Sequence, residues 1–507
     1  MIAALRQRFA RHGWLLAIAL AYLYVFPYFP RIHSANELPR AYLVRAIVDD
    51  HTFSIDRGVQ RWGSTADVSP SRGHAYSNKA PGSSLLAVPF YALWKWTIGD
   101  PSLATTMWIC RVTAGILPAL VFLALLSRFL ARFQPEPEVR RLVLVAYAFG
   151  SMAMPYAMLY YSHQLSAVCA GSAWIFAVDV VERRRGDRAM LAAGAFAGAA
   201  VLVDYQAAFA CAPVAVYVLV RSLEQPFAIV GRRLGLAIAG AAGPLAVLLA
   251  YHAACFGSPW RTGYDSSQTF AVYHQQGFLG LTRPHLDALW GSLFAPDNGL
   301  VTLAPWLLLA IPGGIVLWRR GERDHVATAA AVVVVMVLFV SSLTFWRGGW
   351  GLGPRYITVM LPFALPLCAA AIAELRARPL VLGAVCGAIV YAIVVYAGSI
   401  ATFPFWSDSL TLPLYEVTLR LWRDGVVAPN IANEWGMFGL PSIIPYVAAV
   451  VGLTGWAIVR LASWRGLAVA VVVAALLVAA LGLVPHGDDH AERAYVQTIR
   501  PSLPPAW

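Results

Sequence analysis

The polar stretch 34-SANELPRAYLVRAIVDDHTFSID-56 follows directly on an apolar run at residues 14–29. It gathers acidic and basic side chains, namely Glu37, Asp49, Asp50, Asp56, Arg40, Arg45 and His51. The rest of the sequence is strongly apolar: 59% of its 507 residues are hydrophobic and 13% are charged, with a mean hydropathy of +0.63. Soluble domains carry about 25% charged residues. The composition therefore indicates a membrane protein with many spans, in which a charged segment of this kind lies outside the bilayer.

Long apolar runs recur along nearly the whole chain. Since a span needs about 20 apolar residues, we predict about thirteen transmembrane helices, at 13–30, 102–130, 142–161, 163–182, 189–204, 207–222, 235–256, 300–318, 326–345, 356–375, 380–400, 443–462 and 467–484. The first follows a basic start and has no small-residue cleavage site behind it, so we expect an uncleaved signal anchor. Segment 85–98 is too short to span and is expected to be re-entrant or interfacial. The prediction is one all-α domain over 1–507, a polytopic transmembrane helix bundle.

Arginines in the short connections indicate the orientation. With the N-terminus in the cytoplasm, every inside connection is basic, through Arg132, Arg140, Arg141, Arg183, Arg184, Arg185, Arg188, Arg232, Arg233, Arg319, Arg320, Arg323, Arg376, Arg378 and Arg465. This distribution follows the positive-inside rule. It places the long polar segments outside, at 31–101, 257–299, 346–355, 401–442 and from 485 onward. The net charge of +12 is explained by this topology, and we expect no nucleic-acid partner.

The first outer segment, 31–101, holds the first candidates for chemistry. A helix is predicted over 39–48, and its apolar positions share one face, at Leu38, Tyr42, Ala46 and Ile47. Such an amphipathic helix would lie in the membrane interface. Glu37 precedes the helix, where a carboxylate is electrostatically favoured, and it is either a general base or a plain capping carboxylate. Lys79 precedes the turn pair Pro81-Gly82 and either binds a lipid phosphate as a point charge or snorkels from the bilayer.

Further candidates lie where spans meet outside. His163 and the pair Asp204-Tyr205 stand at two tight junctions, where an ionisable group is either functional or part of a polar connector. The glycine-rich stretch 344-TFWRGGWGLGPRYITVMLPF-363 contains Arg347 and Arg355 beside tryptophans. It could form an ordinary aromatic belt or hold an anion.

Several familiar motifs are absent from the sequence. There is no GxxxxGK[ST] phosphate loop, no GxGxxG after a strand, no HExxH and no GxSxG. The six cysteines lie in apolar segments without ligand spacing, so we expect buried free thiols and no metal site built on them. A nucleotide fold is therefore excluded, and any activated donor is expected outside, on a membrane lipid.

Four stretches in order resemble the GT-C superfamily of membrane glycosyltransferases, which use sugars linked to a polyprenyl phosphate. They are Asn36-Glu37 through Asp56, Tyr76 through Tyr91, Tyr156 through His163, and Trp346 through Pro362, and the segment 277–310 is also similar. The nearest resemblance is to bacterial relatives of protein O-mannosyltransferases and of lipid A aminoarabinose transferases. It implies a multi-pass protein of the bacterial inner membrane whose active side is extracytoplasmic. The implied partners are membrane lipids, a polyprenyl-phosphate-linked sugar as donor, and a glycan, lipid or protein as acceptor.

The resemblance also implies roles for named residues. The family carries an acidic pair in its first outer loop, one member being the base, whereas this sequence has Asn36-Glu37. An amide cannot take up a proton at neutral pH, so Glu37 becomes the expected base and Asn36 a hydrogen-bonding neighbour. Arg40, Lys79 and Arg355 are the cations expected to bind the lipid phosphate, with His163, Asp204 and Tyr205 also expected at the substrate. Some relatives use a divalent cation, which is possible here, although no ligand spacing demands one.

Other functions stay open on the sequence alone. A transporter or lipid-carrier flippase would place charges at the bilayer midplane, with broken helices and repeats, whereas here the acids cluster outside. A glycan polymerase or ligase would use similar groups, and the Asn36 substitution leaves room for an inactive scaffold. An inverting glycosyltransferase accounts best for the long outer segments, since it needs one carboxylate and cations near the lipid headgroup.

Overall fold

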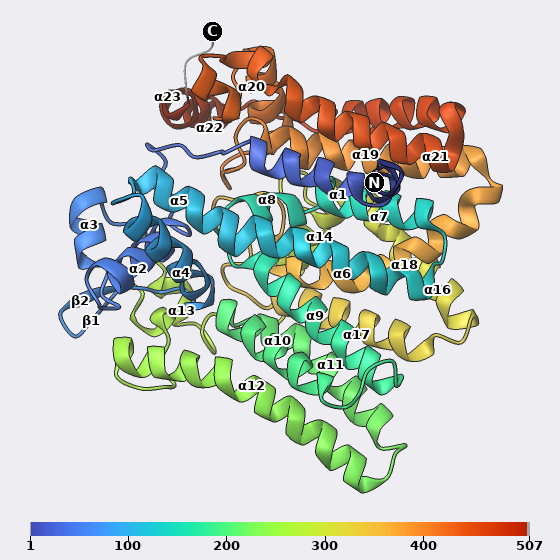
Figure 1. The fold of residues 1–507 in the computed structure, drawn as a ribbon. Coiled ribbons are helices and arrows are strands. Elements are labelled where there is room, and N and C mark those ends of the chain that lie inside the picture. The colour runs from blue at the N-terminus through green and yellow to red at the C-terminus, as the bar shows by residue number, and fades with distance from the viewer. Residues whose placement is uncertain (1, 504–507) are drawn as a thin grey trace.

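Long apolar helices form the body of the molecule (Figure 1). The computed structural model describes residues 2–503, and 71% of the protein is helical, which confirms the predicted helical class. The longer helices are α1 (Ile2–Tyr24), α5 (Leu103–Arg111) continued through the π-helical turn η1 (Val112–Ile116) into α6 (Leu117–Phe133), α7 (Pro137–Phe149), α9 (His163–Val181), α10 (Ala189–Val203), α11 (Ala207–Ser222), α12 (Phe227–Phe256), α16 (Ala310–Arg319), α17 (Arg323–Ser341), α18 (Leu361–Glu374), α19 (Pro379–Ile400) and α21 (Gly439–Leu481).

Seven helical stretches in the described residues are long and apolar enough to cross a membrane. They are Leu103–Phe133, His163–Val181, Phe227–Phe256, Arg323–Ser341, Arg355–Ala377, Pro379–Ile400 and Gly439–Leu481. Four shorter apolar helices accompany them, at Gly13–Tyr24, Ala189–Val203, Ala207–Ser222 and Pro305–Arg319. The last long stretch consists of two helices that meet at Ser463, whose φ of 65° lies outside the helical range. By length and composition these helices agree with the predicted helical membrane protein, while the count of thirteen spans stays a prediction.

One predicted span does not form as a single helix. Helix α7 ends at Phe149, and the chain continues through the short α8 (Ala153–Met158) and a non-helical segment before α9 begins at His163. Gly150 takes a non-helical conformation at the end of α7, and the segment after α8 supplies backbone to the site described below.

Small residues allow neighbouring helices to approach closely. A Cβ at Gly194 of α10 would collide with the backbone of Ala237 in α12, and one at Gly240 would collide with Leu191. Gly313 of α16 meets the backbone of Leu367 in α18 in the same way. Such contacts are typical of helices that pack within a membrane, where small residues let backbones approach.

The first outer segment folds into a group of short elements at one end of the bundle, on the left in Figure 1. They are α2 (Leu38–Asp49), α3 (Asp56–Trp62), β1 (Val68–Ser71), β2 (His74–Ser77) and α4 (Gly82–Thr97). The two strands form an antiparallel hairpin in which Val68 pairs with Ser77. Short elements from later segments are η2 (Gly263–Ser266), α13 (Ala271–His274), α14 (Leu286–Phe294), α15 (Leu300–Leu303), η3 (Pro305–Leu309), η4 (Arg355–Met360), η5 (Leu375–Ala377), η6 (Leu414–Leu419), α20 (Arg420–Arg423), η7 (Ile431–Trp435), α22 (Asp489–Ala494), η8 (Tyr495–Ile499) and α23 (Arg500–Ser502).

Helix α2 is present as predicted, but it is not an amphipathic helix with one polar face in solvent. Every residue from Leu38 to Ala46 is buried, including both arginines, Arg40 at 3% and Arg45 at 6% exposure. Arg45 can be buried because it pairs with Asp49 of the same helix and with Asp100. In contrast, the predicted interfacial piece 85–98 forms most of α4, which exposes apolar side chains at Leu86, Phe90, Leu93, Trp96 and Ile98.

The chain that leads into the first outer segment is tied to distant parts of the molecule. Beyond α1, the Phe26 amide donates to the carbonyl of Pro429 at 2.8 Å, and Val25 forms a β-bridge with Asn430. The Tyr24 hydroxyl donates to the carbonyl of Ser442 at 2.6 Å. The six cysteines are free, and five of them are buried.

Candidate active site

Two adjoining cavities lie at the end of the bundle where the outer segments gather. The larger has a volume of about 580 Å³ and the smaller about 340 Å³. They share a boundary made by Asn36, Lys79, Tyr264, His274, Phe345 and Tyr356. These residues come from two of the predicted outer segments and from the ends of two predicted spans, at Phe345 and Tyr356. The fold therefore brings together parts of the chain that are far apart in sequence.

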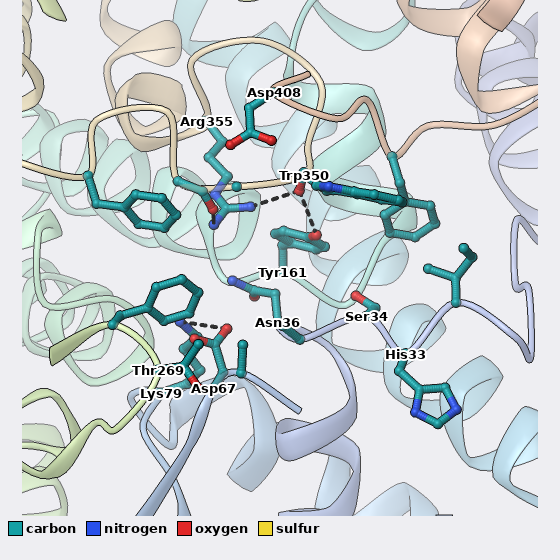
Figure 2. Close-up of a pocket in the computed structure, with 18 of the residues that line it drawn as sticks. His33, Ser34, Asn36, Asp67, Lys79, Tyr161, Thr269, Trp350, Arg355 and Asp408 are labelled. Atoms are coloured by element: carbon teal, nitrogen blue, oxygen red, sulfur yellow. Dashed lines mark hydrogen bonds and ion pairs between the residues drawn. The ribbon is translucent and has the colours of Figure 1, made fainter. Parts of the chain in front are cut away.

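The β1–β2 hairpin positions Lys79 at the shared boundary. Asp67 stands just before β1 and Asn78 just after β2, and the Asn78 amide donates to the Asp67 carbonyl at 3.1 Å. The Lys79 ammonium lies 2.9 Å from Oδ2 of Asp67, and the Asn78 side-chain amide donates to Oδ1 at 3.2 Å. Figure 2 shows this pair on one wall of the larger cavity. Burial lowers the pKa of Lys79, and the neighbouring Asp67 carboxylate opposes that shift.

Arg355 reaches the larger cavity from the glycine-rich segment, opposite Lys79 in the view of Figure 2. Its guanidinium donates to the carbonyl of Trp350 at 3.1 Å and to that of Gly348. It also stacks over the ring of Tyr161, with its central carbon 5.2 Å from the ring centroid. Gly348 has a φ of +73°, and a Cβ there would lie 2.9 Å from Nε of Arg355. The glycine is therefore needed for the arginine to lie where it does.

Arg40 and Asn36 lie on the wall of the smaller cavity. Arg40 donates to the Asn36 carbonyl at 2.5 Å, contacts the Asn36 side-chain oxygen, and donates to the Ser162 hydroxyl at 3.0 Å. Ser162 in turn donates to Asp204 at 3.0 Å, and His163 lies 2.9 Å from the same carboxylate oxygen. This polar network joins the first outer loop to the start of α9 and the end of α10.

Tyr205 and a set of apolar side chains complete the smaller cavity. The Tyr205 hydroxyl lies 2.9 Å from Nε2 of His252. The apolar residues are Val203, Phe209, Phe278, Leu279, Leu281, Phe339 and Leu343, and the Phe209 and Phe339 rings lie 4.9 Å apart. A cavity with cations at one end and apolar walls beyond suits an amphiphile with an anionic head and a hydrocarbon chain.

Glu37, the expected base, points away from both cavities. Its carboxylate accepts two hydrogen bonds from Arg111, each at 2.9 Å, and a third from the Tyr160 amide at 2.7 Å. It is 1% exposed and makes no capping hydrogen bond to α2. An acceptor hydroxyl would have to reach a carboxylate enclosed in this way, and neither expected role, base or cap, fits the geometry.

Two residues without an expected role contact the expected site residues Glu37 and Lys79. Arg111 is the partner of Glu37, and it lies inside a predicted span, where an ionisable side chain signals a buried partner. Asp67 contacts Lys79, but its sequence surroundings are an ordinary polar turn that gives no such signal. The other expected residues, Asn36, Arg40, Lys79, His163, Asp204, Tyr205 and Arg355, all border one cavity or both.

The described residues around the two cavities contain no cluster of metal ligands. Among residues 2–503, no group of three or more His, Cys, Asp or Glu side chains could hold a metal ion. Asp67 is engaged by Lys79 and Asp204 by His163.

The fold is similar to that of membrane glycosyltransferases of the GT-C superfamily, as the resemblance in the sequence implies. Among solved structures, the chain is similar to ArnT from Cupriavidus metallidurans in the apo state, with a TM-score of 0.53 and 16% identity over 98% of this chain and 78% of ArnT. It is also similar to ArnT bound to undecaprenyl phosphate, with a TM-score of 0.50 and 16% identity over 99% of this chain and 78% of ArnT. No protein-family model matches the sequence, and a comparison with curated protein sequences finds no match.

Proposed function

We propose that the protein is an integral membrane glycosyltransferase that moves a sugar from a polyprenyl-phosphate donor to an acceptor hydroxyl. The observation that carries this proposal is that Arg40 and Arg355 are buried at the cavities, at 3% and 5% exposure, and neither forms an ion pair with a carboxylate in the described chain. Their partners are neutral oxygens of Asn36, Ser162, Gly348 and Trp350.

Buried cations with neutral partners favour an anionic ligand. Removing a charge from water without a counter-charge is costly, so a protein retains such groups where a bound anion compensates them. Nε of Arg40 and Nε of Arg355 have no hydrogen-bond partner in the structure. A phosphate offers several acceptor oxygens and forms strong charge-assisted hydrogen bonds with guanidinium groups.

The apolar part of the smaller cavity argues for a lipid-linked phosphate over a free one. We infer that the prenyl chain passes along Phe209 and Phe339, while Arg40 and Lys79 hold the phosphate. Arg355 adds positive charge from the larger cavity. The presence of undecaprenyl phosphate in a structure of similar fold supports this arrangement.

The acceptor then enters through the larger cavity. Its hydroxyl oxygen attacks C1 of the sugar while the bond from C1 to the phosphate oxygen breaks, and the electron pair leaves with the lipid phosphate. The cations stabilise the charge that develops on that phosphate. One displacement with acceptor and leaving group on opposite faces of C1 inverts the anomeric configuration. The acceptor is a glycan, a lipid or a protein.

The expected setting is the bacterial inner membrane, with the site on its extracytoplasmic face. The basic connections support that orientation, and the cavities border several predicted outer segments. A transporter would carry its site near the middle of the bundle, whereas the elements of these cavities lie toward one end of it (Figure 1).

The test uses the purified full-length chain in nanodiscs. Undecaprenyl phosphate should bind, and undecaprenol, which lacks the phosphate, should bind at least tenfold more weakly. The chain should also release undecaprenyl phosphate from synthetic undecaprenyl-phosphate-linked hexoses or pentoses when a lipid and glycan extract of bacterial envelopes is added. Equal affinity for both lipids, together with no release from any donor, would overturn the proposal.

A further inference from the structure

The structure lacks a general base at the two positions where the resemblance implies one. Asn36 is an amide, and Glu37 is enclosed by Arg111 and the Tyr160 amide. Transfer to a hydroxyl still needs a proton acceptor within hydrogen-bonding reach of the acceptor. The candidates are the carboxylates that border the cavities in the described chain, Asp67, Asp204 and Asp408.

Asp204 and Asp408 are poorly suited to this task. Oδ2 of Asp204 is shared by Ser162, His163 and Gln206 at 2.9–3.2 Å, and Asp204 borders only the smaller cavity. In an inverting displacement the base acts on the face of the sugar opposite the leaving group, so it belongs in the cavity that does not hold the prenyl chain. Asp408 borders that larger cavity, but it is exposed to solvent.

Asp67 meets the requirements that the others fail. It borders the larger cavity and not the smaller, and it is 4% exposed. Its side chain accepts from Lys79 at Oδ2 and from Asn78 at Oδ1, and a carboxylate with about four acceptor sites has capacity left for a third donor. We propose that Asp67 is the general base of the transfer, in place of the acid that Asn36 replaces; this inference rests on the proposed function.

The transfer moves one proton and exchanges one bond at C1 of the sugar. The acceptor O–H bond breaks and its proton passes to a carboxylate oxygen of Asp67, while the acceptor oxygen forms the new bond to C1. The C1–O bond to phosphate breaks, and undecaprenyl phosphate leaves with the electron pair. Asp67 later gives its proton to water, which restores the carboxylate for the next turnover.

The contact between Asp67 and Lys79 couples donor binding to this base. Lys79 borders both cavities, so a phosphate in the smaller cavity competes with Asp67 for the ammonium. Donor binding would therefore free Oδ2 of Asp67 to accept a hydrogen bond from the acceptor hydroxyl, which favours chemistry on the occupied enzyme.

Asp67→Asn tests the assignment, because the amide keeps the shape of the side chain and removes its basicity. Binding of undecaprenyl phosphate should be retained or become tighter, since Lys79 loses its competitor, while sugar transfer should fall about 10²–10⁴-fold. Asp67→Glu should recover part of the rate, and the rise of the rate with pH on the acidic side should be missing from Asp67→Asn. A residue that only held Lys79 in place would instead weaken phosphate binding and leave the pH profile unchanged.

Asp56→Asn is the matched control. Asp56 lies in the same outer segment and accepts hydrogen bonds from the Ala75 amide and Ser54, but it borders neither cavity, so its variant should transfer at the wild-type rate. A wild-type rate in Asp67→Asn would overturn the inference, and if His163→Gln were then inactive, the His163–Asp204 pair would be the base. If the wild-type chain neither binds undecaprenyl phosphate nor uses any donor, the proposed function itself fails, which is a separate outcome from either result.

Discussion

Glu37 and Arg111 form a bidentate ion pair from which solvent is excluded. Both side chains are 2% exposed, and Nη2 of Arg111 lies 2.8 Å from Oε1 of Glu37. The ring of Phe26 lies against the guanidinium, its centroid 5.1 Å from the central carbon. The pair connects the residue before α2 to the end of α5, so it fixes the first outer helix to the following span.

Glu37→Gln should therefore reduce the stability of the fold before it affects chemistry. Removing one partner leaves the Arg111 charge buried without compensation, which typically costs about 3–5 kcal/mol. We expect a lower temperature of unfolding in detergent, and Glu37→Gln combined with Arg111→Gln should be more stable than Glu37→Gln alone. A variant with wild-type stability and no sugar transfer would contradict this role and return Glu37 to the position of base.

The two lysines of the sequence offer a matched test of phosphate binding. Lys79→Ala should weaken binding of undecaprenyl phosphate by about 1.5–3 kcal/mol, the usual contribution of a hydrogen bond to a charged group. Lys95 lies in the same outer segment and is paired with Asp49 at 2.6 Å, away from both cavities, so Lys95→Ala should bind like the wild type. The measurement is the dissociation constant in nanodiscs, and equal losses in the two variants would count against a phosphate site at Lys79.

Phosphate binding should also weaken at alkaline pH. Burial lowers the pKa of Lys79 below its ordinary value of 10.5, so the ammonium loses its proton, and with it the attraction for phosphate, earlier than an exposed lysine would. The lipid phosphate is already fully ionised in this range because its second pKa is about 6. Affinity should therefore fall as pH rises toward 10.5, and Lys79→Arg, which stays charged, should remove the decline. The same decline in both proteins would point to another group.

Two neighbouring glycines, Gly348 and Gly349, allow the effect of backbone strain on donor binding to be distinguished from the effect of displacing Arg355. Gly348 and Gly349 have φ values of +73° and +78°, so alanine is strained at either position by about 1 kcal/mol. At Gly348 the new Cβ would also meet Arg355 at 2.9 Å, whereas at Gly349 the nearest atom, in Phe345, is 3.6 Å away. Gly348→Ala should thus weaken undecaprenyl phosphate binding several-fold more than Gly349→Ala, although both should lose similar backbone stability. Equal affinities in the two variants would indicate that Arg355 does not contribute to donor binding.

Much of the architecture can be predicted from the sequence because bilayer thickness and apolar run length constrain it directly. Asn36, Lys79, His163 and Arg355, which the sequence and its family resemblance indicate as site residues, all border the cavities. These residues carry a local signal, since each is a polar group at a membrane boundary.

The roles within the site could not be predicted in the same way. Whether Glu37 faces a cavity or Arg111 depends on the rotation of α2 and on a partner 74 residues away. Asp67 acquires its contact only when the β1–β2 hairpin closes, and the interfacial face predicted for α2 is covered by protein from other segments. Such outcomes depend on packing between distant segments, which spacing along the chain does not record.

The hydrogen bonds from Tyr24 and Phe26 to Ser442 and Pro429 have a consequence for biogenesis. The chain is synthesised from its N-terminus, and the segment that leads into the first outer loop is anchored by residues made some 400 positions later, 418 in the case of Tyr24 and Ser442. Nascent chains that have inserted most of their spans still lack that anchor. The larger cavity is also bordered by Thr498, close to the end of the chain, so it takes its final form only when translation is nearly complete.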